Sequence, residues 1–126
     1  MDIGKTLTVR NRLAWRRWLA KHHADTQEIW LVYYKKTAGK SGISYEESVL
    51  EGVAYGWIEG QNKSIDDERY AARFTPRRPK SNWSASNIAR AKKMLAEGLM
   101  AEPGLATLPP EISLPRLRGR VGVGAK

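Results

Sequence analysis

Hydrophobic side chains recur at helical spacing in three parts of the chain. These parts are residues 9–23, 45–55 and 85–97. In each part the apolar positions fall on one face, which predicts an amphipathic helix packed against a core. The second helix also has a start signal, since Ser44 and Glu47 have the spacing of a capping box, and a stop signal at Gly56.

Other patterns predict strands between these helices. Residues 28–35 are apolar on both faces, which is typical of a central strand covered on both sides. Residues 68–74 alternate in polarity, and a short strand at 57–59 precedes them, with a turn near 60–62. This order of elements predicts an α+β domain, with a small, mostly antiparallel sheet packed against three main helices.

Length and composition narrow the class of protein. A chain of 126 residues has room for one domain. It has no run of about 18 apolar residues, so we expect no membrane-spanning helix. The first residues lack the apolar stretch of a secretory signal, and the absence of cysteine excludes disulfides and thiol chemistry. We therefore expect a cytoplasmic protein.

The end of the chain differs in composition from the rest. Residues 103–126 contain four prolines and four glycines but no aromatic side chain. Such a segment buries too little surface to offset the entropy lost on ordering. We predict a folded domain over residues 1–106, followed by a disordered tail rich in proline, glycine and arginine over residues 107–126.

The net charge of +9 is divided into blocks. Residues 69–96 contain eight basic and no acidic side chains, whereas residues 41–68 contain seven acidic and one basic. Two interpretations stay open. The basic block forms a binding face for an anionic partner, or its charges pair with the acidic block inside the molecule.

The segment RFTPRRPKSNWS, residues 73–84, combines a stiff backbone with groups that bind anions. Pro76 and Pro79 restrict the chain, so little entropy is lost on binding. Guanidinium and hydroxyl groups beside an aromatic ring suit a phosphate, a carboxylate or a nucleic-acid backbone. Whether Trp83 is a core residue or an exposed platform stays open. The residues predicted to bind the ligand are Arg69, Arg73, Thr75, Arg77, Arg78, Lys80, Ser81 and Trp83.

The neighbouring carboxylates and the two histidines give no catalytic or metal motif. Asp66, Asp67 and Glu68 are consecutive and cannot all face one ion, so we predict that Asp66 and Asp67 orient the arginines. His22 and His23 diverge by about 100° on a helix and cannot serve one site. No Ser/His/Asp pattern is present, and we predict no cofactor and no metal.

Several stretches together resemble a known family. They are WRRWLAKHH (15–23), EIWLVYYKK (28–36), ISYEESV (43–49), YGWIEG (55–60), KSIDDERYAARFTPRRPKSNWS (63–84) and LAEGLMAEPGLA (95–106). Over about residues 10–106 the chain resembles the YdeI/OmpD-associated family, also called bacteriocin-protection proteins. The resemblance implies an α+β domain like that of the YdhG-type proteins, and an association with resistance to bacteriocins or antimicrobial peptides, without an established biochemical activity.

The chain also departs from that family. Glu59 stands where the family usually has Asp, and Ala54 where it often has Cys. The helical segment that usually comes after the PGLA-like stretch is missing, and the sequence from Pro109 looks like read-through after a truncation or frameshift. We therefore expect deletion of residues 108–126 to leave the melting temperature unchanged.

Three functions are hypotheses at this point. The first is a non-enzymatic, stress- or bacteriocin-resistance-associated domain that binds an anionic ligand through the 73–84 segment. The second is a nucleic-acid-binding domain, which needs a continuous basic face with an exposed aromatic. The third is an enzyme for a small phosphorylated or carboxylated substrate, which needs a pocket and a titrating group such as His22, Asp66 or Asp67. A protein partner and the oligomeric state stay open.

Overall fold

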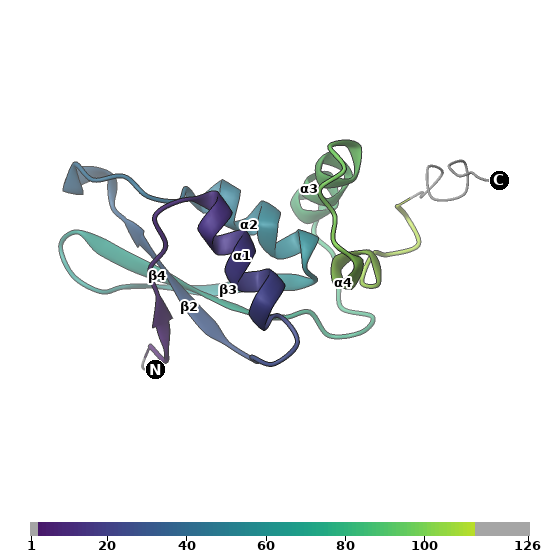
Figure 1. The fold of residues 1–126 in the computed structure, drawn as a ribbon, viewed down its shortest axis with the longest axis horizontal. Coiled ribbons are helices and arrows are strands. Elements are labelled where there is room, and N and C mark those ends of the chain that lie inside the picture. Colours follow the sequence, from purple (N-terminus) through teal and green to yellow (C-terminus); the bar gives the residue numbers. More distant parts are fainter. Residues whose placement is uncertain (1–2, 113–126) are drawn as a thin grey trace.

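The computed structural model describes residues 3–112 and contains a four-stranded sheet, three main helices and two short ones. The strand order is β1-β2-β4-β3, with β1 parallel to β2 and the other pairs antiparallel. The predicted α+β class is confirmed (Figure 1). In chain order the elements are β1 (Thr6–Leu7), α1 (Arg12–His22), β2 (Ile29–Tyr34), the 3-10 helix η1 (Lys36–Ala38), α2 (Tyr45–Ala54), β3 (Trp57–Ser64), β4 (Arg69–Pro76), α3 (Ala85–Ala96) and α4 (Glu102–Leu105).

The predicted central strand is confirmed, because both faces of β2 are buried. Leu31 and its neighbours on one face pack with α1 and α2, which lie across the same side of the sheet (Figure 1). On the other face, Trp30 and Val32 pack with Ala71 of β4 and are flanked by Ile3. Within the described residues, this second face is covered by Ile3 of the N-terminal segment and Ile65 between β3 and β4 rather than by a helix.

The start of α2 is the capping box that the sequence predicts. The Ser44 hydroxyl accepts a hydrogen bond from the Glu47 amide at 3.1 Å, and the Glu47 carboxylate accepts one from the Ser44 amide at 3.2 Å. Two backbone donors that the first turn leaves free are thereby satisfied. Gly56, with φ of +76°, comes after the helix end as predicted.

A buried carboxylate joins the first two helices. Glu51 of α2 is 2 % exposed and accepts from Arg12 Nε at 2.5 Å and Arg16 Nη1 at 2.6 Å, both on α1. Trp15 of α1 also donates its indole N–H to the Ser48 carbonyl at 3.0 Å. Because removing one partner would leave a charge buried without compensation, this ion triad fixes how α1 lies on α2.

The β3–β4 hairpin is longer than predicted. The sequence pattern places a turn at residues 60–62, whereas β3 continues to Ser64. Glu59 pairs with Phe74 and Asn62 with Ala72, so β3 holds a bulge between them. Glycine with polar neighbours is found at bulges as well as at turns. A bulge is recognised only because the strands continue to pair beyond it.

The turn itself is formed around Asp66. One oxygen of its carboxylate accepts hydrogen bonds from the backbone amides of Glu68 and Arg69, both at 2.9 Å. Aspartate side chains stabilise turns in this way.

The sequence does not predict strand β1, because a strand of two residues shows no alternation of polar and apolar positions.

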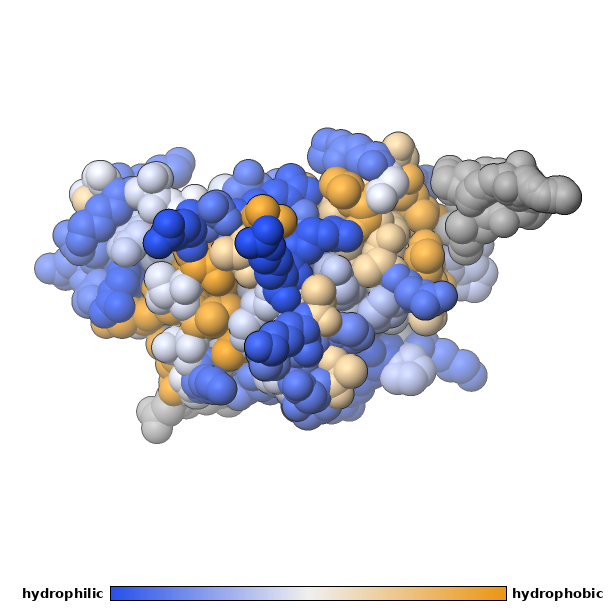
Figure 2. Space-filling view, in the orientation of Figure 1, coloured by the Kyte–Doolittle hydropathy of each residue, from blue (hydrophilic) through white to orange (hydrophobic). Residues whose placement is uncertain are grey.

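Residues beyond the predicted domain boundary at 106 pack against the core. Ile112 is 5 % exposed and belongs to the main core. A Cβ added at Gly104 of α4 would lie 2.1 Å from the Ala54 carbonyl oxygen, so α4 lies directly against the end of α2. Hydrophobic surface gathers at this end of the molecule, around α3 and α4 (Figure 2). Residues 113–126 of the predicted tail lie outside the described residues.

Because Ile112 packs in the core, we now expect a deletion that removes it to lower the melting temperature. We expect Ile112→Ala to lower the free energy of unfolding by about 2 kcal/mol, because a buried side chain is truncated at the edge of the core. Urea unfolding followed by tryptophan fluorescence measures this. Leu13→Ala, at a position 53 % exposed, is the matched control and should cost less than about 0.5 kcal/mol. Equal, small effects would contradict the packing of the segment.

Candidate functional site

The side chain of Arg77 is buried where β4 ends. It comes directly after Pro76, the last residue of the strand, and only 7 % of Arg77 is exposed. Its backbone amide donates to the Gly56 carbonyl at 2.8 Å, which ties the chain to the turn between α2 and β3. The position of Arg77 is therefore set by the end of β4 and by this backbone hydrogen bond.

The guanidinium of Arg77 lies over an aromatic ring. Its central carbon is 3.8 Å from the centroid of Trp83. Nη1 donates to the Ser81 hydroxyl at 2.9 Å and to the Asn82 carbonyl at 3.0 Å. Nη2 is buried and has no hydrogen-bond partner, and no carboxylate pairs with Arg77 among residues 3–112.

This arrangement leaves a buried positive charge without a carboxylate partner among residues 3–112. Burial lowers the pKa of the Arg77 guanidinium, since desolvation disfavours the charged form. Arginine stays protonated in proteins, so the charge remains. The Trp83 ring offsets part of the cost through a cation–π interaction of about 2 kcal/mol when desolvated. The unpartnered Nη2 group still costs about 1–3 kcal/mol.

Residues 77–83, which we call the arginine loop, connect β4 to α3. Lys80 in this loop has φ of +60°, a left-handed conformation that costs energy for a residue with a side chain. Ser84 then caps α3, because its hydroxyl accepts from the Asn87 amide at 3.1 Å. The loop is thus held at both ends by regular elements and contains local strain between them.

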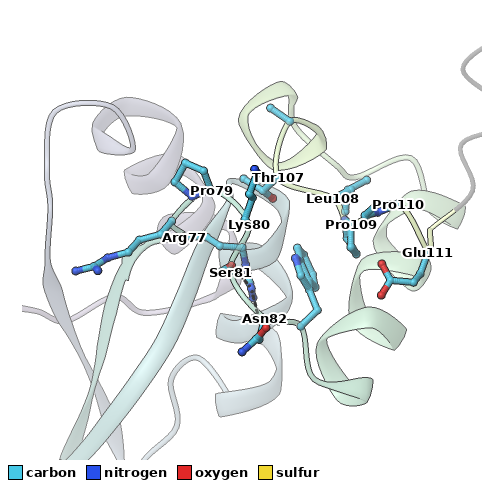
Figure 3. A pocket seen from close by; sticks show the side chains of 13 residues that line it. Arg77, Pro79, Lys80, Ser81, Asn82, Thr107, Leu108, Pro109, Pro110 and Glu111 are labelled. Atoms are coloured by element: carbon cyan, nitrogen blue, oxygen red, sulfur yellow. Dashed lines mark hydrogen bonds between the residues drawn. The ribbon is translucent and has the colours of Figure 1, made fainter.

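A pocket of about 690 Å³ lies beside the arginine loop. The loop lines one side, and residues 106–111, which come after α4, line the other (Figure 3). Of the lining residues, Glu111 alone carries a carboxylate. The residues that line the pocket are Arg77, Arg78, Pro79, Lys80, Ser81, Asn82, Trp83, Ala106, Thr107, Leu108, Pro109, Pro110 and Glu111.

The pocket brings together part of the predicted ligand-binding set. Five of those residues line it: Arg77, Arg78, Lys80, Ser81 and Trp83. Trp83 is both a core residue and a platform, since it is half-buried against the core and its ring also contacts the Arg77 guanidinium. Sequence reasoning misses the wall at 106–111, because its proline-rich composition is typical of a tail.

The remaining predicted residues lie elsewhere. Arg69 pairs with Asp66 at 2.8 Å in the β3–β4 turn, at the opposite end of β4 from Arg77. Asp66 therefore orients Arg69, but away from the pocket. Arg73 pairs with Glu28 instead, a residue of the segment before β2. Asp67 makes no ion pair within the described part of the chain.

The basic block divides into paired and unpaired cations. Arg69, Arg73, Arg90 and Lys93 each form an ion pair with a carboxylate. Arg77, Arg78, Lys80 and Lys92 form none among residues 3–112. Both interpretations of the basic block therefore hold in part, and three of the four unpaired cations are gathered at the pocket.

The acidic and histidine residues weighed for catalysis lie outside this pocket. Hydrogen bonds from Arg69 and from the turn backbone lower the pKa of Asp66 to about 2, so it is a poor base. His22 bonds to Asp25 at 3.2 Å, at the end of α1. Within residues 3–112, no three histidine or carboxylate side chains converge as a metal site would require. None of the helices there is both long and apolar enough to span a membrane.

One family model matches the sequence over residues 7–107, which is most of the chain. The model describes a domain of unknown function, DUF8412. The chain belongs to this family. No curated protein and no solved structure matches it. The DUF8412 match includes the whole arginine loop and ends at Thr107, within the opposite wall of the pocket.

The Asp66–Arg69 pair predicts a pH dependence of stability. A carboxyl pKa that is lowered on folding contributes stability above its unfolded value, and this contribution is lost as the pH falls from about 4 towards 2. We expect Asp66→Asn, which keeps an acceptor for the turn amides, to be less stable than the parent near neutrality. The difference should shrink below about pH 4 in urea unfolding.

Asp67→Asn is the matched control, since it removes the same charge from a neighbouring residue that makes no ion pair in the described residues. A difference for Asp66→Asn that does not change with pH would contradict the ion pair as its cause.

Proposed function

We propose that this DUF8412 domain is a non-enzymatic binding protein that takes up a small anionic molecule in the pocket beside the arginine loop. One observation carries the proposal: the buried guanidinium of Arg77, which has an unpartnered Nη2 group and no carboxylate partner among the described residues. A buried polar group without a partner is rare in folded proteins and calls for an explanation.

An anion in the pocket would lower the energetic cost of burying this guanidinium through electrostatic attraction. The attraction between two charges is several times stronger in a partly buried site than in water. Hydrogen bonds from a guanidinium to a phosphate or carboxylate are also stronger than bonds between neutral groups. Arg78 and Lys80 are exposed at the same pocket and add to its positive potential.

The other walls of the pocket favour a ligand with an apolar part. Trp83, Leu108, Pro109 and Pro110 contribute mostly carbon surface to the lining. The volume of about 690 Å³ lies in the range of pockets that hold small molecules. We therefore expect the ligand to combine a phosphate or carboxylate group with an apolar or planar body.

Binding is favoured over catalysis because the lining residues include no matched acid and base. The ionisable lining groups are cations, apart from Glu111. A nucleic-acid interface has less support, since four of the eight cations in the basic block are paired with carboxylates and do not form a row of free charges. A role in resistance to bacteriocins and a cytoplasmic location belong to the proposal only through the sequence resemblance and composition.

The test is a calorimetric titration with inorganic phosphate and with benzoate, comparing the parent with Arg77→Met. We expect the variant to bind either probe at least about tenfold more weakly. Arg77→Met removes the cost of burying the charge together with the hydrogen bonds and the cation–π contact of Arg77. Because these effects oppose each other, we expect the free energy of unfolding to stay within about 1 kcal/mol. The loss of binding would then not be a loss of folding.

Two matched variants sharpen this test. Lys92→Gln removes an exposed, unpaired charge on α3 outside the pocket and should change the affinity by less than about twofold. Glu111→Gln removes the negative charge from the pocket lining and should tighten binding. Equal affinities for the parent and Arg77→Met would refute the proposal, as would a single-stranded oligonucleotide that binds far more tightly than either probe.

A further inference from the structure

A second hollow adjoins the pocket and shares part of its wall. It has a volume of about 370 Å³. Arg77, Arg78 and Pro79 line both spaces, so these three residues form a ridge between them. The remaining lining residues of this second hollow are Gln27, Arg73, Thr75 and Pro76.

Strand β4 supplies the side chains of the second hollow. Arg73 and Thr75 flank Phe74, whose side chain is buried in the main core. Alternate residues of a strand point to opposite faces, so Arg73 and Thr75 project from the face away from α1 and α2. The hollow is therefore separated from the helical core by the sheet itself.

The ion pair of Arg73 leaves donors available to this hollow. Arg73 donates to Glu28 through Nε, and its two Nη groups make no hydrogen bond within residues 3–112. Glu28 therefore fixes the guanidinium without using its outer donors. No carboxylate lines the hollow, whereas Arg78, Thr75 and Gln27 add a further guanidinium, a hydroxyl and an amide. Guanidinium forks of this kind match the oxygens of a phosphate group.

We infer that the pocket and the second hollow form one composite site for a ligand with two or more phosphate-like groups. This inference rests on the proposed function, since it assigns one anionic group to the pocket beside Arg77 and Lys80. The other group lies in the second hollow, against Arg73 and Thr75. Arg78 is exposed and lines both spaces, so it contacts both groups across the ridge.

A small polyphosphorylated molecule fits these observations better than a nucleic-acid strand. A strand needs a continuous row of free cations along its backbone. The cations next to the composite site along the chain, Arg69, Arg90 and Lys93, are paired with carboxylates. Within the basic block of residues 69–96, the cations without a carboxylate partner are Lys92 on α3 and three residues that line the pocket, Arg77, Arg78 and Lys80.

The test compares tripolyphosphate with inorganic phosphate by calorimetry, at one ionic strength. We expect tripolyphosphate to bind the parent at least about tenfold more tightly than phosphate. Arg73→Gln should remove most of this gain and leave the phosphate affinity within about twofold, because phosphate alone occupies the pocket. Lys92→Gln, with the same loss of charge, should keep the gain.

Glu28→Gln separates a binding role of Arg73 from a structural one. It breaks the same ion pair as Arg73→Gln but leaves the guanidinium in place. If Arg73 binds the ligand, Glu28→Gln keeps or increases the affinity for tripolyphosphate. If the ion pair only supports the fold, both variants lose affinity alike, and the inference is overturned.

The outcomes distinguish this inference from the proposed function. Phosphate binding that depends on Arg77, with no gain for tripolyphosphate or no effect of Arg73→Gln, would overturn the composite site alone. No binding of either anion would overturn both. A single-stranded oligonucleotide that binds more tightly than tripolyphosphate, with a steep salt dependence, would overturn the small-molecule form in favour of nucleic acid.

Discussion

The contact between the Arg77 guanidinium and the Trp83 ring connects the sheet to the part of the molecule that forms the pocket. The central carbon of the guanidinium lies 3.8 Å from the ring centroid, so the contact joins the two ends of the arginine loop, between the end of β4 and the start of α3. The Arg77 amide also bonds to Gly56, so the loop is tied to the end of α2. In this arrangement Nη2 of Arg77 is buried without a hydrogen-bond partner, and the functional proposals depend on this unpartnered group.

The second wall of the pocket depends on close packing between short elements. Gly104 approaches the Ala54 carbonyl so closely that a side chain would not fit, and Ile112 anchors the chain beyond α4. These contacts bring residues 106–111 opposite the arginine loop (Figure 3). A polar loop on its own would be a surface feature. The added wall makes it a concave site, in which the arginine loop supplies the cations and the opposite wall is largely apolar apart from Thr107 and Glu111.

Local signals explain what could be predicted from the sequence. The capping box at Ser44 and the two apolar faces of β2 depend on neighbouring residues, and both are present. The pairing of charges is not local, because Arg73 meets Glu28 across 45 positions of the chain rather than the nearby Asp66. Likewise, the composition of the 107–112 segment gives no sign that Gly104 lets it dock. The sequence therefore predicts the candidate ligand residues as a group, but not their division between the pocket, the second hollow and the hairpin turn.

The central claim is that Arg77 is a buried cation that an anion completes, and side-chain nitrogen NMR of the guanidinium tests it most directly. Arg77→Met assigns the signal, and Arg17, exposed on α1, serves as the reference. We predict that the Arg77 protons exchange with water far more slowly than those of Arg17. We also predict that the Arg77 signals shift saturably as inorganic phosphate is added. Exchange as fast as that of Arg17, or phosphate binding without any shift at Arg77, would contradict this claim.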